Sequence, residues 1–483
     1  MYPLSDDFAR LLPELSVPWQ AEAPLQPELL MLSEPLARDL GFDPVALRSD
    51  RGIRFLLGTE LDDAAHPVAQ LYAGHQFGSY VSRLGDGRAL LLGERRGSDG
   101  RLRDLHLKGS GKTPLARADG RAAVGPMLRE SLMGEAMHAL GVPTTRALAV
   151  IATGRRVIRD DALPGAVLVR VADSHLRVGT FQYARSTGDL ELLRRLVDFA
   201  VARHVPEAVE APDPALALLR HVVAAQARLV ASWMLLGFVH GVLNTDNVTI
   251  SGQTIDYGPC AFIDAYDPAA VFSSIDHAGR YAFGTQPAIT LWNLTRLAEM
   301  LLPLLSEDES AATALATEVL EGFAPAYEAA WIAGMAAKLG LSGADGSGHA
   351  SGEVAELAGE FLGALQRHRL DFTSSFRALG GIARGGAARF GEHSAADLGL
   401  DEWVARWLDL TPDAERMDAV NPIYIPRNHL VDEALDAASD GDLSLVERLA
   451  GVLARPFEER AGLERYAAGP PEGAPPHRTF CGT

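Results

Sequence analysis

The pattern of apolar positions changes along the chain, from short strand-like runs in the first part to long helical periodicities in the rest. The runs 88–94 and 102–108 are bounded by the glycine-rich turns 85–87 and 97–100. Short apolar runs separated by such turns are typical of a β-hairpin. A further apolar run at 167–171 is predicted to be another strand.

Helical periodicity begins inside this strand-rich part and then dominates the chain. Apolar residues recur at three- and four-residue steps over 127–140, and Gly141 follows them. This spacing predicts a helix that ends at the glycine. Further along, the segments 190–204 and 214–238 are the clearest helices.

Together these elements predict an α+β fold with a β-rich N-lobe, which contains one helix, and an α-rich C-lobe. A chain of 483 residues is long enough for two lobes with extensions. We expect an N-terminal extension at 1–65, the N-lobe at 66–188, the C-lobe at 189–340, and a helical C-terminal extension and tail at 341–483. The Gly- and Ser-rich segment 341–352 is predicted to be a flexible linker.

Charge and composition exclude several classes of protein. The net charge of −19 opposes generic binding to nucleic acid or to anionic membranes, because its field repels phosphates. Gln226 and Arg228 interrupt the most apolar stretch, 221–243, which therefore predicts a buried helix and no membrane span. Two cysteines exclude a disulfide scaffold, and the first residues lack the pattern of a signal peptide. We expect a cytoplasmic monomer.

Residues 240–259 contain the strongest candidate for chemistry. A polar loop that includes Asn247 follows a long apolar helix, and a strand-like run at 248–250 precedes Asp-Tyr-Gly at 256–258. A hairpin here would bring Asn247 and Asp256 together. Their amide and carboxylate oxygens are the hard ligands that magnesium prefers, as in the protein-kinase active site. Each residue alone is a common turn former, but the pair in this setting favours a metal site.

A candidate ion pair lies in the strand-rich lobe. Lys108 ends a predicted strand, and Glu130 and Glu135 lie on the following helix. Kinase-like lobes pair a strand lysine with a helix glutamate, so that the lysine points toward phosphates. The spacing alone does not choose between the two glutamates, and both could be ordinary surface charges.

Three further motifs suggest phosphate binding. The segment 109–113, Gly-Ser-Gly-Lys-Thr, resembles the end of a P-loop, but His106 stands where the first glycine is required. We interpret it as an anion-binding turn. The turn Gly85-Asp86-Gly87-Arg88 could cover a nucleotide, although it lacks the third glycine of the kinase pattern. Arg170 and Arg177 could hold phosphates bidentately, or serve as salt-bridge partners.

The catalytic base of protein kinases has no equivalent in this chain. Kinases place that aspartate five residues before the metal-binding asparagine, and here this position is Val242. Asp246, next to Asn247, is the remaining carboxylate of the loop.

At this point the sequence resembles one family, the selenoprotein O family of kinase-fold protein adenylyltransferases. The similarity covers nearly the whole chain. The matching stretches are 72–78, 84–88, 105–111, 129–132, 141–148, 240–259, 421–422 and 427–428. The resemblance implies a protein-kinase-like bilobal fold with N- and C-terminal extensions. It also implies transfer of AMP from ATP to Ser, Thr or Tyr hydroxyls of protein substrates, with ATP held in the direction opposite to that in a kinase.

Carried over position by position, the resemblance also implies the roles of individual residues. The nucleotide site would be lined by Gly85, Gly87, Arg88, Lys108, Asp119, Gly120, Glu130, Arg170, Arg177 and Asp256. Asn247 and Asp256 would bind Mg²⁺, with Mn²⁺ as the alternative ion, and Asp246 would accept the proton. The chain departs from the family in a short stretch between Lys108 and Asp119, in Cys260 after Asp-Tyr-Gly-Pro, and in a tail with the single cysteine Cys481. We expect both thiols to be unpaired.

Two other functions remain open on the sequence. An atypical protein kinase would transfer the γ-phosphate with the same lysine, glutamate and metal ligands. A nucleotide-binding pseudokinase scaffold would explain the missing base. All three hypotheses share ATP as the ligand.

Overall fold

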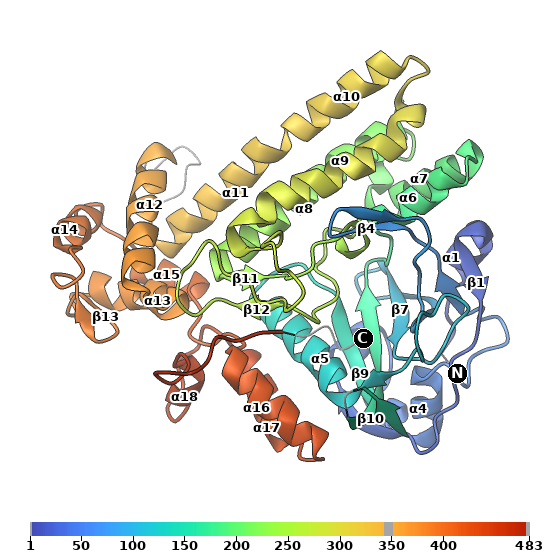
Figure 1. Ribbon diagram of the computed structural model, residues 1–483, viewed down its shortest axis with the longest axis horizontal. Coiled ribbons are helices and arrows are strands. Elements are labelled where there is room, and N and C mark those ends of the chain that lie inside the picture. Colours follow the sequence, from blue (N-terminus) through green and yellow to red (C-terminus); the bar gives the residue numbers. More distant parts are fainter. Residues whose placement is uncertain (1, 160, 342–350, 480–483) are drawn as a thin grey trace.

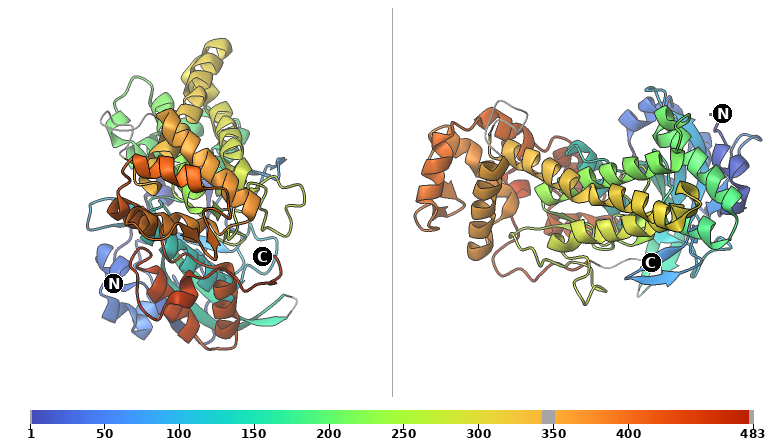
Figure 2. Two further views of the ribbon diagram at one scale, coloured as in Figure 1. Left: turned by 90° about the vertical axis from the view of Figure 1, so that its left-hand side faces the viewer. Right: turned by 90° about the horizontal axis from the view of Figure 1, so that it is seen from above.

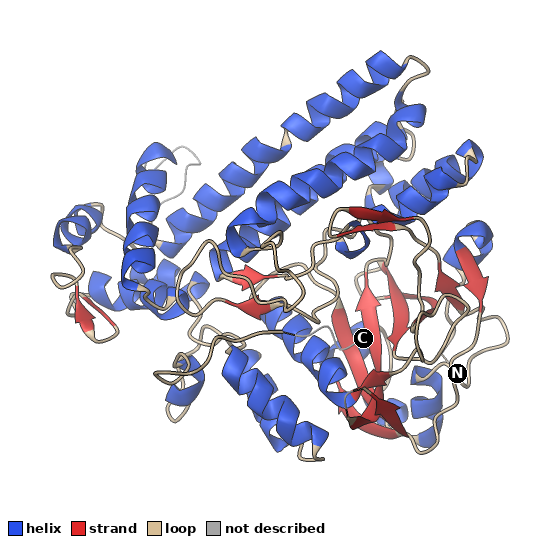
Figure 3. Ribbon diagram, in the orientation of Figure 1, coloured by secondary structure: helices blue, strands red, loops and turns tan. Residues whose placement is uncertain are grey.

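The computed structural model describes residues 2–159, 161–341 and 351–479. Strands gather at one end of the molecule and long helices at the other, as Figure 1 and Figure 3 show. The predicted α+β composition, with strands first and helices after, is confirmed. Most of the linker predicted at 341–352 lies outside the described residues. Cys481 lies outside them as well.

An antiparallel sheet of eight strands forms the strand-rich end. Its order is β1 (Ser16–Pro18), β3 (Val68–Gln70), β6 (Ala89–Arg96), β7 (Leu102–Lys108), β10 (Ala162–Ala172), β9 (Arg146–Ile158) and β2 (Glu28–Leu32), with β8 (Ala122–Ala123) pairing with β10. The predicted hairpin is β6–β7. Residues 1–65 supply β1 and β2 at the two edges of the sheet, which the sequence pattern had not predicted.

The two-residue period of the strands gives the sheet two different faces. Leu105 and Leu107 of β7 pack into one apolar cluster with residues of the N-terminal helices. The intervening side chains of Asp104, His106 and Lys108 are buried without belonging to that cluster. Alternation therefore directs a row of polar side chains from β7 toward the opposite face, where the long helix α5 (Val124–Ala139) packs on β9 and β10.

Six helices follow the sheet: α6 (Val178–Ser186), α7 (Leu190–His204), α8 (Pro214–Leu236), α9 (Gln286–Leu305), α10 (Glu309–Glu321) and α11 (Phe323–Lys338). Asp213 caps the start of α8, and Gly237, with φ of 73°, ends it. Among the described residues α8 alone is long and apolar enough to span a membrane, but most of it is buried. It packs against α9 and α11 as a core helix, which agrees with the prediction of a buried helix.

The C-terminal residues divide between two places. A second apolar core contains α12 (Ser351–His368), α13 (Phe372–Ala383), α14 (Asp401–Asp409) and α15 (Ala414–Val420). The chain then returns, and α16 (Asn428–Ser439) and α17 (Ser444–Leu453) pack on α5; the short helix α18 (Glu464–Ala467) follows. Figure 2 shows α12–α15 projecting from one end of the molecule, away from the sheet.

The segment 240–260 differs from its prediction. No strand forms at 248–250, and Thr249 makes only an isolated bridge to Arg177. The strands that pair here lie on either side of residues 240–260: β11 (Phe238–Val239) is antiparallel to β12 (Ala261–Phe262). The predicted hairpin is therefore wrong: 240–260 is one long loop whose ends are held together, and a 3-10 helix, Thr245–Asn247, forms within it.

One buried arginine joins the C-terminal residues to this loop. Arg427 is fully buried, and its guanidinium bonds Asp371 at 2.6 and 3.0 Å and Asp264 at 2.8 Å. Asp264 lies two residues after β12, whereas Asp371 caps the start of α13. Charge pairing thus connects the C-terminal core to the end of the loop.

Replacing this arginine should destabilise the protein. In Arg427→Ala the carboxylates of Asp371 and Asp264, which are 22% and 25% exposed, lose their cation. Because they are partly solvated, we expect the free energy of unfolding to fall by about 2–4 kcal/mol, measured by urea denaturation followed by tryptophan fluorescence. Arg406→Ala, which removes an exposed pair with Glu360, is the matched control and should cost less than about 1 kcal/mol. Equal losses in the two variants would contradict this role.

Candidate functional site

A cluster of buried charges lies where the sheet, α5 and the 240–260 loop meet. Lys108 at the end of β7 forms an ion pair with Glu130 of α5, and its Nζ is 2.6 Å from Oδ1 of Asp256. Arg170 of β10 reaches the same two carboxylates, at 3.2 Å from Glu130 and 2.8 Å from Asp256. The predicted strand-lysine and helix-glutamate pair is therefore present. Glu135 is excluded as the partner because it bonds Arg146.

Arg177 links the two halves of the long loop. It lies just before α6, and its Nη1 is 3.6 Å from Oδ2 of Asp256. The same nitrogen donates to the backbone carbonyl of Asp246 at 3.0 Å. The guanidinium also lies over the ring of Tyr72, 4.5 Å from its centre. Arg177 thus fixes the positions of both predicted aspartates, and the guanidinium is itself held by an aromatic face.

Asp256 is held in an unusual state. Its φ of 63° is left-handed, a backbone conformation that is uncommon for residues other than glycine but that aspartate adopts more readily than most. Burial by itself would raise the pKa of its carboxyl, but the cations Lys108, Arg170 and Arg177 lower that pKa well below its usual range. Asp256 is therefore ionised at neutral pH, with three cations around it.

Asp246 has the opposite electrostatic character. Its side chain is buried, and burial raises its pKa to about 6, although Arg177 acts in the other direction. Gln76 Nε2 lies 3.5 Å from Oδ2, while Oδ1 is buried without a hydrogen-bond partner among the described residues. A carboxyl that titrates near neutral pH, with one oxygen left unbonded, is equipped to accept a proton.

Asn247 has its amide orientation fixed. Nδ2 donates to the carbonyl oxygen of Val242 at 2.9 Å, and the backbone N–H donates to Asn244. The amide oxygen is the other end of the same rigid group and forms no hydrogen bond that the described residues supply. Among those residues no cluster of three or more His, Cys, Asp or Glu side chains is arranged to hold a metal. Magnesium that shares its coordination with phosphate oxygens uses only one or two protein ligands.

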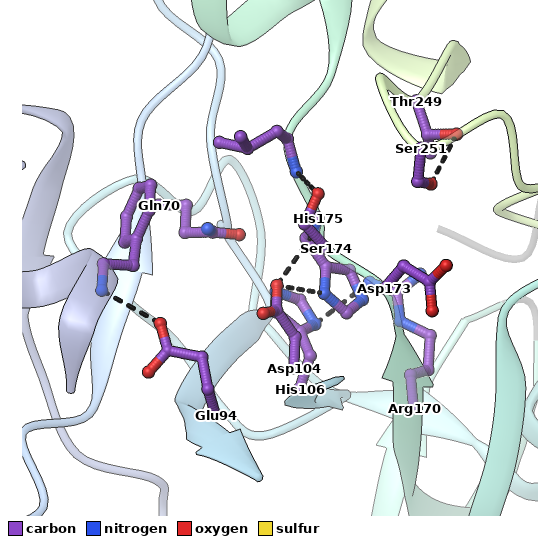
Figure 4. A network of polar contacts seen from close by, with 12 residues as sticks. Gln70, Glu94, Asp104, His106, Arg170, Asp173, Ser174, His175, Thr249 and Ser251 are labelled. Carbon is purple, nitrogen blue, oxygen red and sulfur yellow. Dashed lines mark hydrogen bonds and ion pairs between the residues drawn. The ribbon is translucent and has the colours of Figure 1, made fainter. Parts of the chain in front are cut away.

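A second layer of buried polar groups orients Arg170. Its Nη2 donates to Nδ1 of His106 at 3.2 Å, so that His106 carries its proton on Nε2 and donates to Asp86 at 2.9 Å. His106 stacks on His175 with ring centres 4.1 Å apart, and His175 bonds Asp104, as Figure 4 shows. Burial lowers the pKa of His175 to about 3, so the imidazole next to His106 stays uncharged.

Sequence reasoning had missed this second layer. His106 appeared as the residue that breaks the P-loop pattern and, like Tyr72 and Gln76, as part of a matching stretch, without a role. For His106 the available signal was the two-residue alternation in β7, which places it on the same face as Lys108.

The remaining predicted residues belong to two segments beside β7. Gly85 and Gly87 flank Asp86, which bonds His106, and Arg88 precedes Ala89, which pairs with Lys108. A Cβ on Gly87 would lie 2.9 Å from Cα of Ala116, so this glycine allows the segment after β7 to fold across the turn. Asp119 bonds Arg159 at 3.2 Å and, with Gly120, belongs to the same segment. Among the described residues, no hydrogen bond or ion pair joins Gly85, Gly87, Asp119 or Gly120 to the side chains of Lys108 or Asp256.

The segment 109–113 is not an anion-binding turn in this structure. The backbone N–H groups of Gly109 and Ser110 donate to Arg88, that of Gly111 to Gly120, and that of Thr113 to Gly87. The turn therefore uses these donors on the chain's own carbonyls, and no helix follows it as a P-loop requires. The prediction of an anion-binding turn is wrong for this reason.

A cavity of about 1440 Å³ lies beside this segment, at the edge of the sheet. Its lining includes Trp19, Glu22, Lys112, Asp119 and Arg121. Of the predicted site residues only Asp119 contributes to it. The charge cluster, and not this larger hollow, contains the groups suited to chemistry.

The amino-acid sequence is similar to those of known proteins over nearly its whole length. The sequence model of the family described as "Protein adenylyltransferase SelO" matches residues 5–454. The chain is 61% identical over 482 residues to "Protein nucleotidyltransferase YdiU" of Pseudarthrobacter chlorophenolicus, which covers 99% of this chain and 98% of the relative. The protein of the same description from Mycolicibacterium paratuberculosis is 59% identical over 485 residues, and covers 99% of this chain and 98% of the relative.

The raised pKa of Asp246 predicts a pH-dependent cost in stability. The native state binds this proton more tightly than the unfolded chain, whose aspartate pKa is 3.8, so the contribution of Asp246 to stability falls as the pH rises through about 4 to about 6. The Asp246→Asn variant does not lose stability in this way, because an asparagine side chain does not ionise. Its advantage in free energy of unfolding over the parent should grow by about 2–3 kcal/mol between about pH 4 and about pH 7.5.

This difference is measured by urea denaturation of both proteins across that pH range. Asp198→Asn, which changes an exposed carboxylate on α7, is the matched control and should show no such growth. A gap between Asp246→Asn and the parent that is constant with pH would show that burial does not perturb this carboxyl.

Proposed function

This chain belongs to the SelO family of protein adenylyltransferases and is a nucleotidyltransferase, and we propose that it transfers AMP from ATP to Ser, Thr or Tyr hydroxyls of protein substrates. The observation that carries the proposal is the convergence of Lys108, Arg170 and Arg177 on Asp256, beside a carboxyl, Asp246, that titrates near pH 6. The three cations suit the binding of a polyphosphate, and Asp246 suits the acceptance of a proton from a hydroxyl.

We propose that the fold is kinase-like. The sheet with α5 would be the N-lobe, and the helices from α6 to α11 the C-lobe. The Lys108–Glu130 pair and the 240–260 loop between β11 and β12 support this assignment, because kinase-like enzymes use a strand lysine, a helix glutamate and a loop of metal ligands in these places.

The nucleotide would bind through its phosphates to the three cations. Lys108, Arg170 and Arg177 together carry three positive charges, whereas Glu130 and Asp256 supply two negative charges to them. A phosphate would add further oxygen acceptors for the donors of these three cations. Two arginines beside a lysine suit a polyphosphate tail held deep in the site, as the reversed nucleotide requires. The roles of Gly85, Gly87, Arg88, Asp119 and Gly120 in holding ATP stay predictions.

Asn247 and Asp256 would hold Mg²⁺, with Mn²⁺ as the alternative ion. The residues fit this group: Asp256 is ionised, and the bond from Asn247 Nδ2 to Val242 leaves the amide oxygen as the available donor. Bound magnesium would neutralise negative charge that develops on the phosphates. The left-handed φ of Asp256 is backbone strain of the kind found at functional positions.

Asp246 would accept the proton from the acceptor hydroxyl. Its unbonded oxygen Oδ1 provides the acceptor site, and Arg177 holds its backbone in place. Val242 occupies the position of the kinase base, so the loop offers Asp246 as its proton acceptor. A valine in the position of the kinase base favours AMP transfer over ordinary phosphoryl transfer by an atypical kinase. The ionised carboxylate of Asp256, a proposed metal ligand, favours an enzyme over a scaffold. The cytoplasmic location and the monomeric state stay predictions.

Labelled ATP distinguishes these chemistries. The purified protein is incubated with magnesium, a mixture of acceptor proteins, and ATP labelled at either the α- or the γ-phosphate. We expect label on protein from the α-position only. Label from the γ-position only would establish kinase chemistry instead, whereas ATP binding without label on protein would favour a scaffold.

Asp256→Ala should abolish transfer. The change removes the carboxylate that orients three cations and the proposed metal ligand, so we expect the rate of α-label transfer to fall by at least about a thousandfold. Asp63→Ala, which removes an exposed carboxylate, is the control and should keep the parent rate. Circular dichroism checks that both variants are folded, and a folded Asp256→Ala protein with normal transfer would refute the metal assignment.

A further inference from the structure

A small hairpin covers the proposed proton acceptor. It consists of β4 (Gly74–Gln76) and β5 (Ser79–Val81), and we call residues 74–81 the aromatic hairpin. Its backbone is bonded to the 240–260 loop: the N–H of His75 donates to Thr245 Oγ1 at 2.7 Å, and that of Phe77 donates to Asn244 Oδ1 at 3.0 Å. In Figure 1 the hairpin crosses between the sheet and α9.

The contacts of the hairpin with Asp246 are direct. A Cβ on Gly74 would lie 2.7 Å from Oδ1 of Asp246, so only glycine leaves room for that oxygen. Gln76 approaches the other oxygen at 3.5 Å. The aromatic hairpin therefore borders both carboxyl oxygens of the proposed proton acceptor.

The outer side of the hairpin is apolar and exposed. Phe77, in the turn of the hairpin, is 37% exposed, and Tyr80, on β5, is 47% exposed. Phe77 has a left-handed φ of 50°, and its ring lies 5.1 Å from that of Tyr281. Ile275, in the loop that leads to Tyr281, is 52% exposed. Large apolar side chains that are exposed together on one surface are typical of a binding site.

Two arginines make the same surface positive. Arg280 lies over the ring of Trp292, 4.8 Å from its centre, and Arg296 lies 5.0 Å from the same ring. Trp292 in turn contacts His75 of the aromatic hairpin, with ring centres 5.2 Å apart. Arg296 pairs with Glu299 at 2.6 Å, but no carboxylate of the described residues lies within 4.0 Å of the Arg280 guanidinium.

The charges of both arginines also act on His75 of the aromatic hairpin. The pKa of His75 is lowered, first by burial and then by the charges of Arg296 and Arg280. The whole chain carries a net charge of −19, so a positive surface beside the site stands out from its surroundings. Such a surface attracts an acidic segment and repels a basic one.

We propose that the aromatic hairpin and Arg280 form the docking surface for the acceptor protein, and that it selects a segment with an acidic side chain and an apolar side chain near the acceptor hydroxyl. The proposal rests on the proposed function, because it assumes that Asp246 receives a hydroxyl proton. The apolar side chain contacts Phe77 and Tyr80, and the acidic one pairs with Arg280.

The test uses three synthetic peptides of equal length, each with one serine and one phenylalanine and with flanking glutamates, alanines or lysines. Initial rates are measured with α-labelled ATP and magnesium. In the parent protein we expect the lowest KM for the peptide with glutamates. The KM should rise by about three- to tenfold from that peptide to the one with alanines, and by about the same factor again to the one with lysines. Arg280→Glu should reverse this order while the KM for ATP and the kcat stay as in the parent.

Two further variants complete the design. Phe77→Ala should raise the KM of all three peptides by about tenfold, because a half-exposed aromatic contact is lost. Arg367→Glu reverses an exposed charge on α12, at the far end of the molecule from the hairpin, and should leave the order of the peptides unchanged. An order that Arg280→Glu does not change overturns the proposal. A raised KM for ATP without an effect on the peptides also overturns it, because it would place Arg280 in the nucleotide site.

Binding of the same peptides without ATP separates this proposal from the proposed function. Fluorescein-labelled peptides are titrated with protein and followed by anisotropy. Tighter binding of the acidic peptide that is lost in Arg280→Glu supports the docking surface even if no α-label is transferred, in which case only the proposed chemistry fails. Equal binding of the three peptides overturns the docking surface whatever the transfer assay shows.

Discussion

The burial of ionised groups around Asp256 is the constraint on which the rest of this structure depends. An isolated charge inside a protein costs several kcal/mol, and partners offset that cost only when they arrive together. Here the partners come from four places: Lys108 from β7, Glu130 from α5, Arg170 from β10, and Arg177 from the start of α6. The sheet, the helix and the loop must therefore all be in position before any of these charges is stable.

This constraint explains the unusual features of the long loop. Asp256 takes a left-handed backbone because its carboxylate must face three cations that are fixed on other elements. Asp246 lies close by, yet its side chain pairs with none of them; Arg177 contacts only its backbone carbonyl, and burial keeps its pKa near 6. Two aspartates ten positions apart thus acquire opposite properties from their surroundings: one permanently ionised and suited to hold cations, the other titratable and suited to exchange a proton.

The same loop connects the site to the two extensions. On one side Arg427 ties Asp264, shortly after β12, to the C-terminal core, so the end of the loop depends on residues more than a hundred positions later. On the other side Thr245 and Asn244 hold the aromatic hairpin over Asp246. The first residues of the chain close both edges of the sheet that bears Lys108 and Arg170. Segments that look peripheral in the sequence are therefore structural supports of the site.

The sequence by itself determined the local elements and the positions where chemistry was to be sought. Periodicity gave the β6–β7 hairpin, α5, α7 and α8, because the period of buried positions reports directly on strand or helix. The amide and carboxylate oxygens available in one loop identified Asn247 and Asp256 as candidate metal ligands. Only the tertiary structure decided the choice of Glu130 over Glu135, the second layer of His106 and His175, and the edge strands from residues 1–65. It also showed that the N–H groups of 109–113 are used within the chain. These outcomes depend on which distant groups meet after folding, and the pattern of one segment holds no record of its partners in space.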